Sequence, residues 1–344
     1  MKNMSFDPLK TIDVICVGRV AIDFNPNEMY RTLDKVDTFT KYLGGSPANI
    51  AVGIARLGKK VGFISKVSDD QFGKFVTNYL GDEGIDVSQI AIARNGEVLG
   101  LTFTEISSPT ESQILMYRNG VADLQLSTDD ISEEYIKKAK LLLISGTALA
   151  ASPSREACFL AIHYAKKHGT KVIFDIDYRN YTWKSKADIG VYYAMVGKMS
   201  DIIIGSREEF ELMEILPEGN KVSDCELADK YIAFGNQIII IKHGKQGSIA
   251  YSSDKLAYKV ESFKVKLLKS FGGGDAYASS FIYGVLEGWD LDKALEFGTA
   301  SAAMVVASHS CSNAMKAADE IKGFIESKKD DGKVVTEIDW SDEI

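Results

Sequence analysis

The chain has 344 residues, of which 45% are hydrophobic and 26% are charged, as is usual for a globular protein. Its formal net charge of −8, without any basic stretch rich in aromatic residues, argues against nucleic acid as a partner. Four scattered cysteines and only four histidines offer no spacing for a Cys/His metal site and indicate reduced thiols. Residues 1–10 lack an apolar signal region, so we expect a cytoplasmic protein that contacts no membrane.

Short apolar runs alternate with longer helical patterns along the chain, which predicts βαβ units around a mostly parallel sheet in one α/β domain. Strands are expected at residues 12–17, 61–65, 141–145, 171–175, 201–204 and 237–242. Helices are expected at residues 46–58, 70–80, 154–168, 189–199, 223–234, 274–286 and 291–308. In the first of these helices Ser46 is expected to be the N-cap, followed by Pro47 at the first helical position. The charged segment 328–344 is expected to be a solvated or loosely docked tail.

Two segments, about 24–43 and 98–126, interrupt this alternation with strand-like stretches that have no helix between them. Within the second, LTFTEI and SQILMY alternate polar and apolar residues across a Ser-Ser-Pro turn, which predicts an antiparallel hairpin. We expect these segments to form a small antiparallel lid, which could also serve as a dimer surface. The alternative is an edge extension of the main sheet.

The strongest chemical signal is KSFGGGDAYASSF at residues 269–281. Gly272, Gly273 and Gly274 precede Asp275 at the start of a helix, where backbone amides and the helix dipole favour an anion. An aspartate there can accept the proton of an attacking hydroxyl, which suits phosphoryl transfer. The simpler interpretation is a loop with a helix-capping aspartate. Neither a Walker A motif nor a G-x-G-x-x-G after the first strand is present, so an NAD-type oxidoreductase is remote.

A second signal is LGGSPANIAVGIARLG at residues 43–58. Glycines at its start permit close backbone approach, and Asn49 carries an amide that can bind hydroxyls. A buried asparagine satisfied by backbone is the alternative. Asp23 follows the first strand and could hold vicinal hydroxyls at the carboxyl edge of the sheet.

Together these motifs resemble the two signatures of the ribokinase-like (PfkB) family of carbohydrate kinases, and the similarity runs from about residue 13 to 324. It implies a three-layer α/β/α fold with a β lid, and ATP and Mg²⁺ as cofactors; dependence on K⁺ stays open. Asp275 would be the base and Gly272, Gly273 and Gly274 the anion hole. The implied substrate residues are Asp23, Gly45, Ser46 and Asn49. The implied nucleotide residues are Lys242, Gly244 and Gly247 in KHGKQG, and Thr299, Ala302 and Ala303 beside adenine.

Two positions depart from the family pattern. Gly273 replaces the usual alanine of the anion hole without removing an N–H donor. The family's N-x-x-E element, which organises Mg²⁺ and phosphates, appears as SREE, so Glu209 matches the glutamate as metal residue and Ser206 replaces the asparagine. A serine hydroxyl could still serve the metal; otherwise these residues are an ordinary first helical turn.

Two arginines bear on the substrate. Arg179 follows a strand in FDIDYRNYTW, with Asp177 in place of an asparagine, and Arg118 ends the second lid strand. Both positions resemble those that hold the acid group in 2-keto-3-deoxygluconate kinases, and arginine reads carboxylates bidentately; a surface ion pair is the alternative for each. Longer stretches are similar to family members that phosphorylate the terminal hydroxyl of 5-dehydro-2-deoxygluconate in myo-inositol breakdown. A 2-keto-3-deoxygluconate kinase, a fructokinase and a non-catalytic sugar or nucleotide sensor remain alternatives.

Overall fold

A computed structural model describes residues 4–108, 110–214, 222–269 and 271–342 of the chain. Its centre is a sheet with the strand order β14-β13-β12-β11-β10-β9-β8-β1-β4-β5. The parallel strands are β1 (Ile12–Val17), β4 (Val61–Val67), β5 (Ile90–Ile92), β8 (Ala139–Ser145), β9 (Lys171–Asp175), β10 (Ile202–Ser206) and β11 (Ile238–Lys242). Three antiparallel strands, β12 (Ser248–Ser252), β13 (Ala257–Val260) and β14 (Val335–Ile338), extend one edge.

The central strands are apolar on both sides because both faces of the sheet are covered. In β1, Val14 and Cys16 pack into one core, while Ile15 and Val17 pack into the core on the opposite face. The isoleucine runs of β10 and β11 are buried throughout, as expected for strands in the middle of such a sheet.

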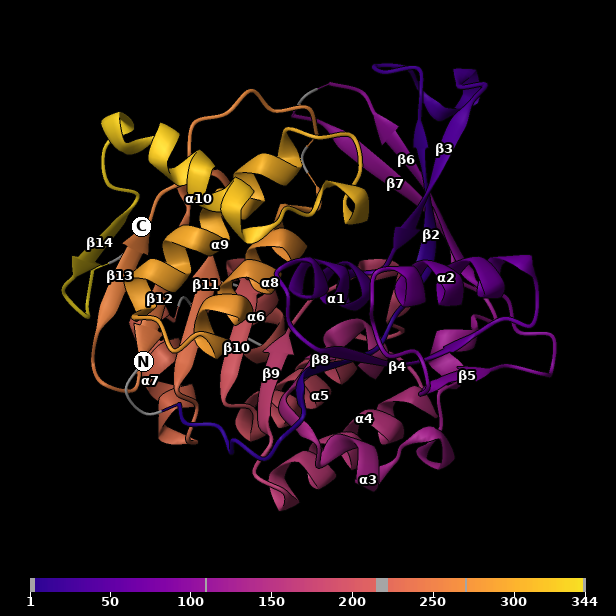
Figure 1. Ribbon diagram of the computed structural model, residues 1–344, viewed down its shortest axis with the longest axis horizontal. Helices are drawn as coiled ribbons and strands as arrows, with labels where there is room; N and C mark the ends of the chain where they lie inside the picture. Colours follow the sequence, from indigo (N-terminus) through magenta and orange to yellow (C-terminus); the bar gives the residue numbers. More distant parts are fainter. Residues whose placement is uncertain (1–3, 109, 215–221, 270, 343–344) are drawn as a thin grey trace.

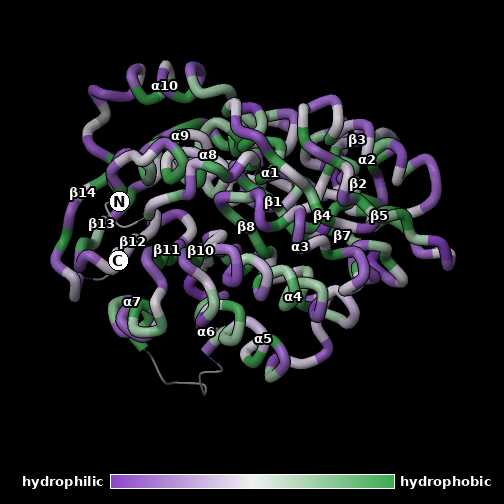
Figure 2. Tube along the Cα trace, turned by 60° about the horizontal axis from the view of Figure 1, so that its bottom comes forward, coloured by the Kyte–Doolittle hydropathy of each residue, from purple (hydrophilic) through white to green (hydrophobic). Residues whose placement is uncertain are grey.

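Helices cover the two faces of the sheet, so the expected three-layer fold is confirmed (Figure 1). The helices of one layer are α1 (Ser46–Arg56), α2 (Gln71–Asp82), α8 (Gly273–Leu286) and α9 (Leu291–Val306), with α10 (Ala318–Ser327) against α9. Those of the other layer are α3 (Glu133–Ile136), α4 (Ser154–Lys167), α5 (Lys186–Met199), α6 (Arg207–Glu214) and α7 (Asp224–Ala233). In Figure 2, apolar residues follow the central strands and inner helices, and hydrophilic residues follow the outer loops. No helix among the described residues is both long and apolar enough to cross a bilayer.

Small residues bring α1, α8 and α9 close together. A Cβ on Gly53 of α1 would lie 2.4 Å from Oγ of Ser279 on α8, and one on Gly284 of α8 would lie 2.7 Å from Cβ of Ala294 on α9. Larger side chains at these positions would push the helices apart. The start of α8 therefore lies beside the start of α1, which positions the site described below.

The two interrupting segments form a separate sheet, which projects from the body at one end (Figure 1). Its order is β3-β2-β6-β7, with β2 (Ala21–Pro26), β3 (Phe39–Gly44), β6 (Gly100–Ile106) and β7 (Ser112–Tyr117). The hairpin β6–β7 is antiparallel as predicted, although Pro109 of its turn lies outside the described residues. Because β2 pairs with β6 in parallel, the lid is a mixed sheet. Its four strands form a sheet of their own, so the alternative of an edge extension of the main sheet is wrong.

His309 is one of the residues that join the lid to the loop after α9; Ser312 of this loop also donates to the Leu43 carbonyl at 3.0 Å. His309 Nε2 lies 2.9 Å from the carbonyl oxygen of Pro26, and its Nδ1 lies 3.0 Å from the hydroxyl of Tyr42. Because a carbonyl only accepts, Nε2 carries the proton and Nδ1 accepts from Tyr42. Asn25 Nδ2 also donates to the His309 carbonyl at 2.9 Å, so three residues of β2 and β3 contact His309.

The expectation of a loose C-terminal tail is wrong for its middle part. Val335–Ile338 forms β14 and pairs antiparallel with β13, and the ring of Trp340 lies 5.0 Å from that of Tyr251. The physical reason is that β13 would otherwise present an unpaired edge. The charges around this short apolar stretch hide it in the sequence.

Candidate active site

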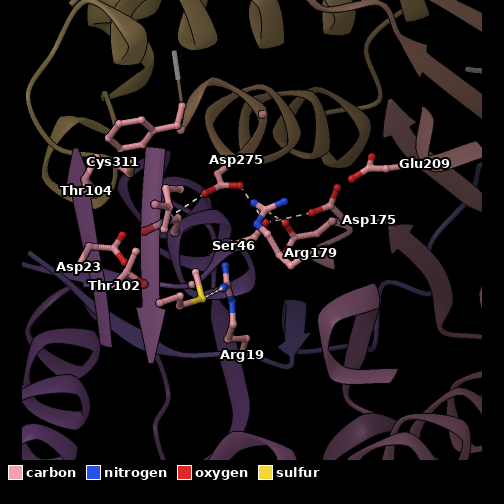
Figure 3. Close-up of a pocket in the computed structure, with 18 of the residues that line it drawn as sticks. Arg19, Asp23, Ser46, Thr102, Thr104, Asp175, Arg179, Glu209, Asp275 and Cys311 are labelled. Atoms are coloured by element: carbon pink, nitrogen blue, oxygen red, sulfur yellow. Dashed lines mark hydrogen bonds and ion pairs between the residues drawn. The ribbon is translucent and has the colours of Figure 1, made fainter. Parts of the chain in front are cut away.

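A cavity of about 430 Å³ opens between the lid and the carboxyl ends of the parallel strands (Figure 3). The wall includes ten residues predicted from the sequence: Asp23, Gly45, Ser46, Asn49, Arg179, Glu209, Lys242, Gly272, Gly274 and Asp275. It also includes residues that were not predicted as site residues, among them Arg19, Thr102, Thr104, Asp175, Phe271 and Cys311. The carboxyl edge of a parallel sheet is the usual place for a ligand in such folds.

Asp275 lies in the first turn of α8, and two side chains of α1 hold its carboxylate. Ser46 Oγ donates to Oδ1 at 2.8 Å, and Asn49 Nδ2 donates to Oδ2 at 2.8 Å. The N-cap of α8 is Gly272, and no side chain caps this helix. The interpretation of Asp275 as a simple helix cap is therefore wrong, and its carboxylate faces the cavity.

Ser46 does not cap α1 as expected. The N-cap is Gly45 with φ 99°, and a Cβ there would lie 2.6 Å from the Arg19 carbonyl oxygen, so only glycine fits. The Ser46 hydroxyl instead lies 3.0 Å from Oδ2 of Asp175 as well as 2.8 Å from Asp275. One hydroxyl has a single proton to donate, so a second hydrogen bond at this serine requires one carboxyl to be protonated.

Backbone amides are concentrated in the glycine turn before Asp275. Gly272 has φ 86°, and a Cβ on it would lie 2.4 Å from Cys311 Sγ. Among the described residues, no protein acceptor takes the N–H groups of Gly272, Gly273, Gly274 or Asp275. Gly273 itself lies off the cavity wall, against Val306 of α9. The turn can therefore receive an anion at the positive end of α8.

Acidic side chains gather on the part of the wall beside Asp275, where Figure 3 shows Asp175 and Glu209. Burial raises the pKa of Asp175, the Lys242 ammonium lowers it, and the charges of Asp177, Glu209 and Asp275 raise it, with a net value of about 7. Burial, followed by the charge of Asp177, also raises the pKa of Asp275, while the hydrogen bonds from Asn49 and Ser46 lower it. This crowding of buried carboxylates favours the arrival of a cation.

Glu209 and Ser206 close the first turn of α6. The Glu209 carboxylate accepts from the backbone N–H of Tyr178 at 2.7 Å and of Ser206 at 2.6 Å, and Ser206 Oγ accepts from the Glu209 N–H at 3.2 Å. Within the described ranges, no group of three or more His, Cys, Asp or Glu is arranged as a complete metal site. Magnesium commonly takes only one or two carboxylates and completes its shell with phosphates and water, which Asp175 and Glu209 could satisfy.

The predicted nucleotide residues divide into two groups. Lys242 ends β11, and its Nζ lies 3.7 Å from the position that a Cβ on Gly274 would take, so it faces the glycine turn. Six others lie off the cavity wall: Ser206, Gly244, Gly247, Thr299, Ala302 and Ala303. Of these, Ala302 packs 3.8 Å from the Cβ position of Gly273, next to the anion turn.

Of the two predicted arginines, only Arg179 lies on the cavity wall. Arg118 is buried in an ion pair with Asp123 at 2.6 Å and lies off the wall, which does not support a role in carboxylate recognition. Arg179 lies on the wall, but its guanidinium pairs with Asp177 at 2.7 Å. Arg19 is 5% exposed; its Nη1 lies 3.5 Å from Met116 Sδ, and its buried Nε has no partner among the described residues. Its position two residues after the first strand was a usable signal, the same one that identified Asp23.

The raised pKa of Asp175 gives a test of the crowding. At about pH 8 the folded protein carries a buried charge that the unfolded chain solvates, so Asp175→Asn should raise the free energy of unfolding by roughly 2–4 kcal/mol. The gain should shrink as the pH falls through about 7 toward 4, because Asp175 then becomes protonated in the folded state. Urea unfolding across this pH range measures it. A gain that does not depend on pH would contradict the assignment.

Comparison with known proteins agrees with this geometry. Residues 11–318 match the family model described as pfkB family carbohydrate kinase. The chain is 65% identical over 331 residues to a 5-dehydro-2-deoxygluconokinase of Clostridium tetani (strain Massachusetts / E88), covering 96% of this chain and 98% of that protein. It is 51% identical over 329 residues to the 5-dehydro-2-deoxygluconokinase of Geobacillus kaustophilus (strain HTA426), with 96% and 98% covered.

Solved structures share the fold. A protein from E. coli in complex with ATP and Mg²⁺ has a TM-score of 0.82 at 23% identity, over 92% of this chain and 99% of that one. A Vibrio cholerae O395 fructokinase double mutant, in a form with fructose, ADP and potassium ion, has a TM-score of 0.81 at 22% identity over the same shares. With both signatures facing one cavity and the family match spanning most of its length, this chain belongs to the pfkB family of carbohydrate kinases.

Proposed function

We propose that this kinase transfers the terminal phosphoryl group of ATP to the terminal hydroxyl of 5-dehydro-2-deoxygluconate, giving the 6-phosphate. The relatives' names support the substrate. The observation that carries the chemistry is the Asp275 carboxylate, held by Ser46 and Asn49 at the cavity wall beside a turn whose amides have no acceptor among the described residues.

In the proposed reaction, the substrate hydroxyl lies against Asp275, which accepts its proton as the oxygen attacks phosphorus. The new O–P bond forms while the bond from phosphorus to the departing ADP oxygen breaks. Amides of the glycine turn take the charge of the phosphoryl group in transfer. Lys242 faces the same turn and is placed to contact phosphate oxygens. Asp175 and Glu209 would hold Mg²⁺ with the nucleotide, and the metal would neutralise phosphate charge there.

Replacing the proposed base gives the most direct test. Asp275→Asn keeps the size and the hydrogen-bond acceptor but cannot take the proton, so kcat should fall by about 10³-fold or more. ATP affinity, measured by calorimetry, should change little. A coupled ADP-release assay checks kcat, with the exposed Asp188→Asn as a control for handling. A sugar or nucleotide sensor without catalysis would show no turnover in the unmodified protein either.

We further propose that Arg19 binds the carboxylate of the sugar acid. Figure 3 shows Arg19 and Asp275 on opposite sides of the cavity, with Ser46 between them. The substrate has six carbons, with the carboxylate at one end and the reacting hydroxyl at the other, so the two residues match its two ends. The guanidinium is almost buried, and its one side-chain hydrogen bond within the described residues is to a thioether, which leaves donors available for an anion even though its charge also acts on Asp23.

Arg19→Ala should therefore lower kcat/KM for the acid by about 30- to 100-fold, the typical value of a charge-assisted hydrogen bond. Turnover of a neutral sugar such as fructose should change less than about threefold. Arg118→Ala is the matched control, because its ion pair with Asp123 predicts lost stability without selective loss of the acid. A panel of 5-dehydro-2-deoxygluconate, 2-keto-3-deoxygluconate and fructose gives these ratios. Equal losses on acid and neutral sugars would contradict carboxylate recognition by Arg19.

We also propose a cytoplasmic homodimer that pairs through the outer side of the lid. Leu115 and Tyr117 of β7 are 47% and 60% exposed, which leaves apolar surface on an edge strand. The four cysteines are free thiols, in agreement with a reducing compartment. Sedimentation should give a dimer mass that Leu115→Lys reduces to the monomer mass; a monomeric unmodified protein would contradict this assembly.

A further inference from the structure

One fully buried lysine lies directly behind the glycine turn. Lys269 is 0% exposed, and its Nζ donates to the Ser310 carbonyl at 2.9 Å and contacts Cys311 Sγ at 3.2 Å. The ammonium also lies 4.5 Å from the centre of the Phe271 ring. The backbone N–H of Lys269 donates to the Val306 carbonyl at the end of α9, so both ends of the residue are fixed.

This ammonium has no ion-pair partner within the described part of the chain. A buried charge is costly unless something compensates it. The direct contacts of Nζ are a carbonyl, a thiol and a ring, which supply only partial charges, and the Asp23 carboxylate interacts with the ammonium from beyond ion-pair distance. By contrast, the other buried lysine, Lys10, lies at the amino end of β1, where Nζ donates to Ala139 O at 2.8 Å and Thr170 Oγ1 at 2.5 Å. Lys10 does not line the cavity.

The place where an opposite charge can arrive is the anion turn. A Cβ on Gly272 would lie 3.2 Å from Lys269 Nζ, so the ammonium is in contact with the backbone of that turn. Phe271, Gly272 and Cys311, which surround Nζ, all line the cavity. The lysine itself does not line it, so it acts across the turn rather than by touching the substrate.

We propose that Lys269 is a positioning residue that supplies a fixed positive charge behind the anion hole and so stabilises the phosphoryl group during transfer. This inference rests on the proposed function of the same site. In a cavity screened from water, a charge set in place before the reaction needs no reorganisation when negative charge develops in front of it.

A role as a mere pin between the turn and the loop after α9 makes different predictions. A purely structural role needs the hydrogen bonds and the volume of the side chain. Lys269→Gln keeps part of the hydrogen bonding, and Lys269→Met keeps most of the volume. A fixed charge needs the cation, which both variants lose. If the charge matters, kcat should fall by about 30- to 100-fold in both variants, while KM for the sugar stays within about threefold.

The readout that separates charge from structure is binding of a transition-state mimic. The affinity for aluminium fluoride with ADP and sugar should weaken by a factor close to the loss in kcat, because the planar anion occupies the place of the transferring group. ATP binding without aluminium fluoride should change much less. Lys10→Met is the matched control, with expected loss of stability and unchanged kcat.

Chemical rescue covers the case in which both variants fold poorly. Lys269→Ala leaves space for a small cation, so ethylammonium should raise its kcat by about fivefold or more, whereas the larger, non-donating tetraethylammonium should not. Unmodified kcat in Lys269→Gln or Lys269→Met, or no rescue of a folded Lys269→Ala, would overturn the proposal. Turnover by Asp275→Asn would instead overturn the proposed function, so the two failures are distinguishable.

Discussion

The structure depends most on the fixed position of one carboxylate at the cavity wall. Asp275 is held by a hydroxyl and an amide from α1, each at 2.8 Å, and this requires the starts of α1 and α8 to lie together. Glycines and small side chains in the contacts of α1, α8 and α9 make that approach possible. The packing of one helix layer therefore sets the position of the proposed base, and the strands serve mainly to bring further groups to the same edge.

Acidic and basic side chains lie on different parts of the cavity wall. Asp175, Asp177 and Glu209 crowd one side, and the raised pKa of Asp175 records the cost of that crowding. Lys242, Arg19 and the concealed Lys269 put positive charge on the remaining sides and behind the glycine turn. The acidic side chains and the basic side chains are therefore each only partly neutralised by other groups of the protein. A magnesium nucleotide and an acidic sugar supply the missing charges of each sign, which links the proposed substrates to the electrostatics of the protein alone.

The order of strands and helices was readable from the sequence because the buried strands are continuous apolar runs and the helices carry clear caps and glycine stops. Ser46 shows what the sequence could not predict. A serine before proline is typical of a helix cap, but the Ser46 hydroxyl contacts the carboxyl groups of Asp175 and Asp275, which are distant in sequence. Arg118 and Arg179 look alike as lone arginines, and only the fold shows that one faces Asp123 in the interior. Lys269 carried no signal, since a lysine in a loop is ordinarily solvated. The strand at 335–338 was missed because its partner edge is defined only in three dimensions.

The histidine contacts of the loop after α9 have a mechanical consequence. His309 of this loop contacts the lid through Tyr42 and Asn25. The next two residues, Ser310 and Cys311, contact Lys269 behind the glycine turn. A sugar that draws the lid inward would pull on the same short segment that fixes the lysine. Binding of the sugar would thus change the position of Lys269 behind the glycine turn. An enzyme with this connection would transfer little phosphoryl group to water before an acceptor alcohol has bound.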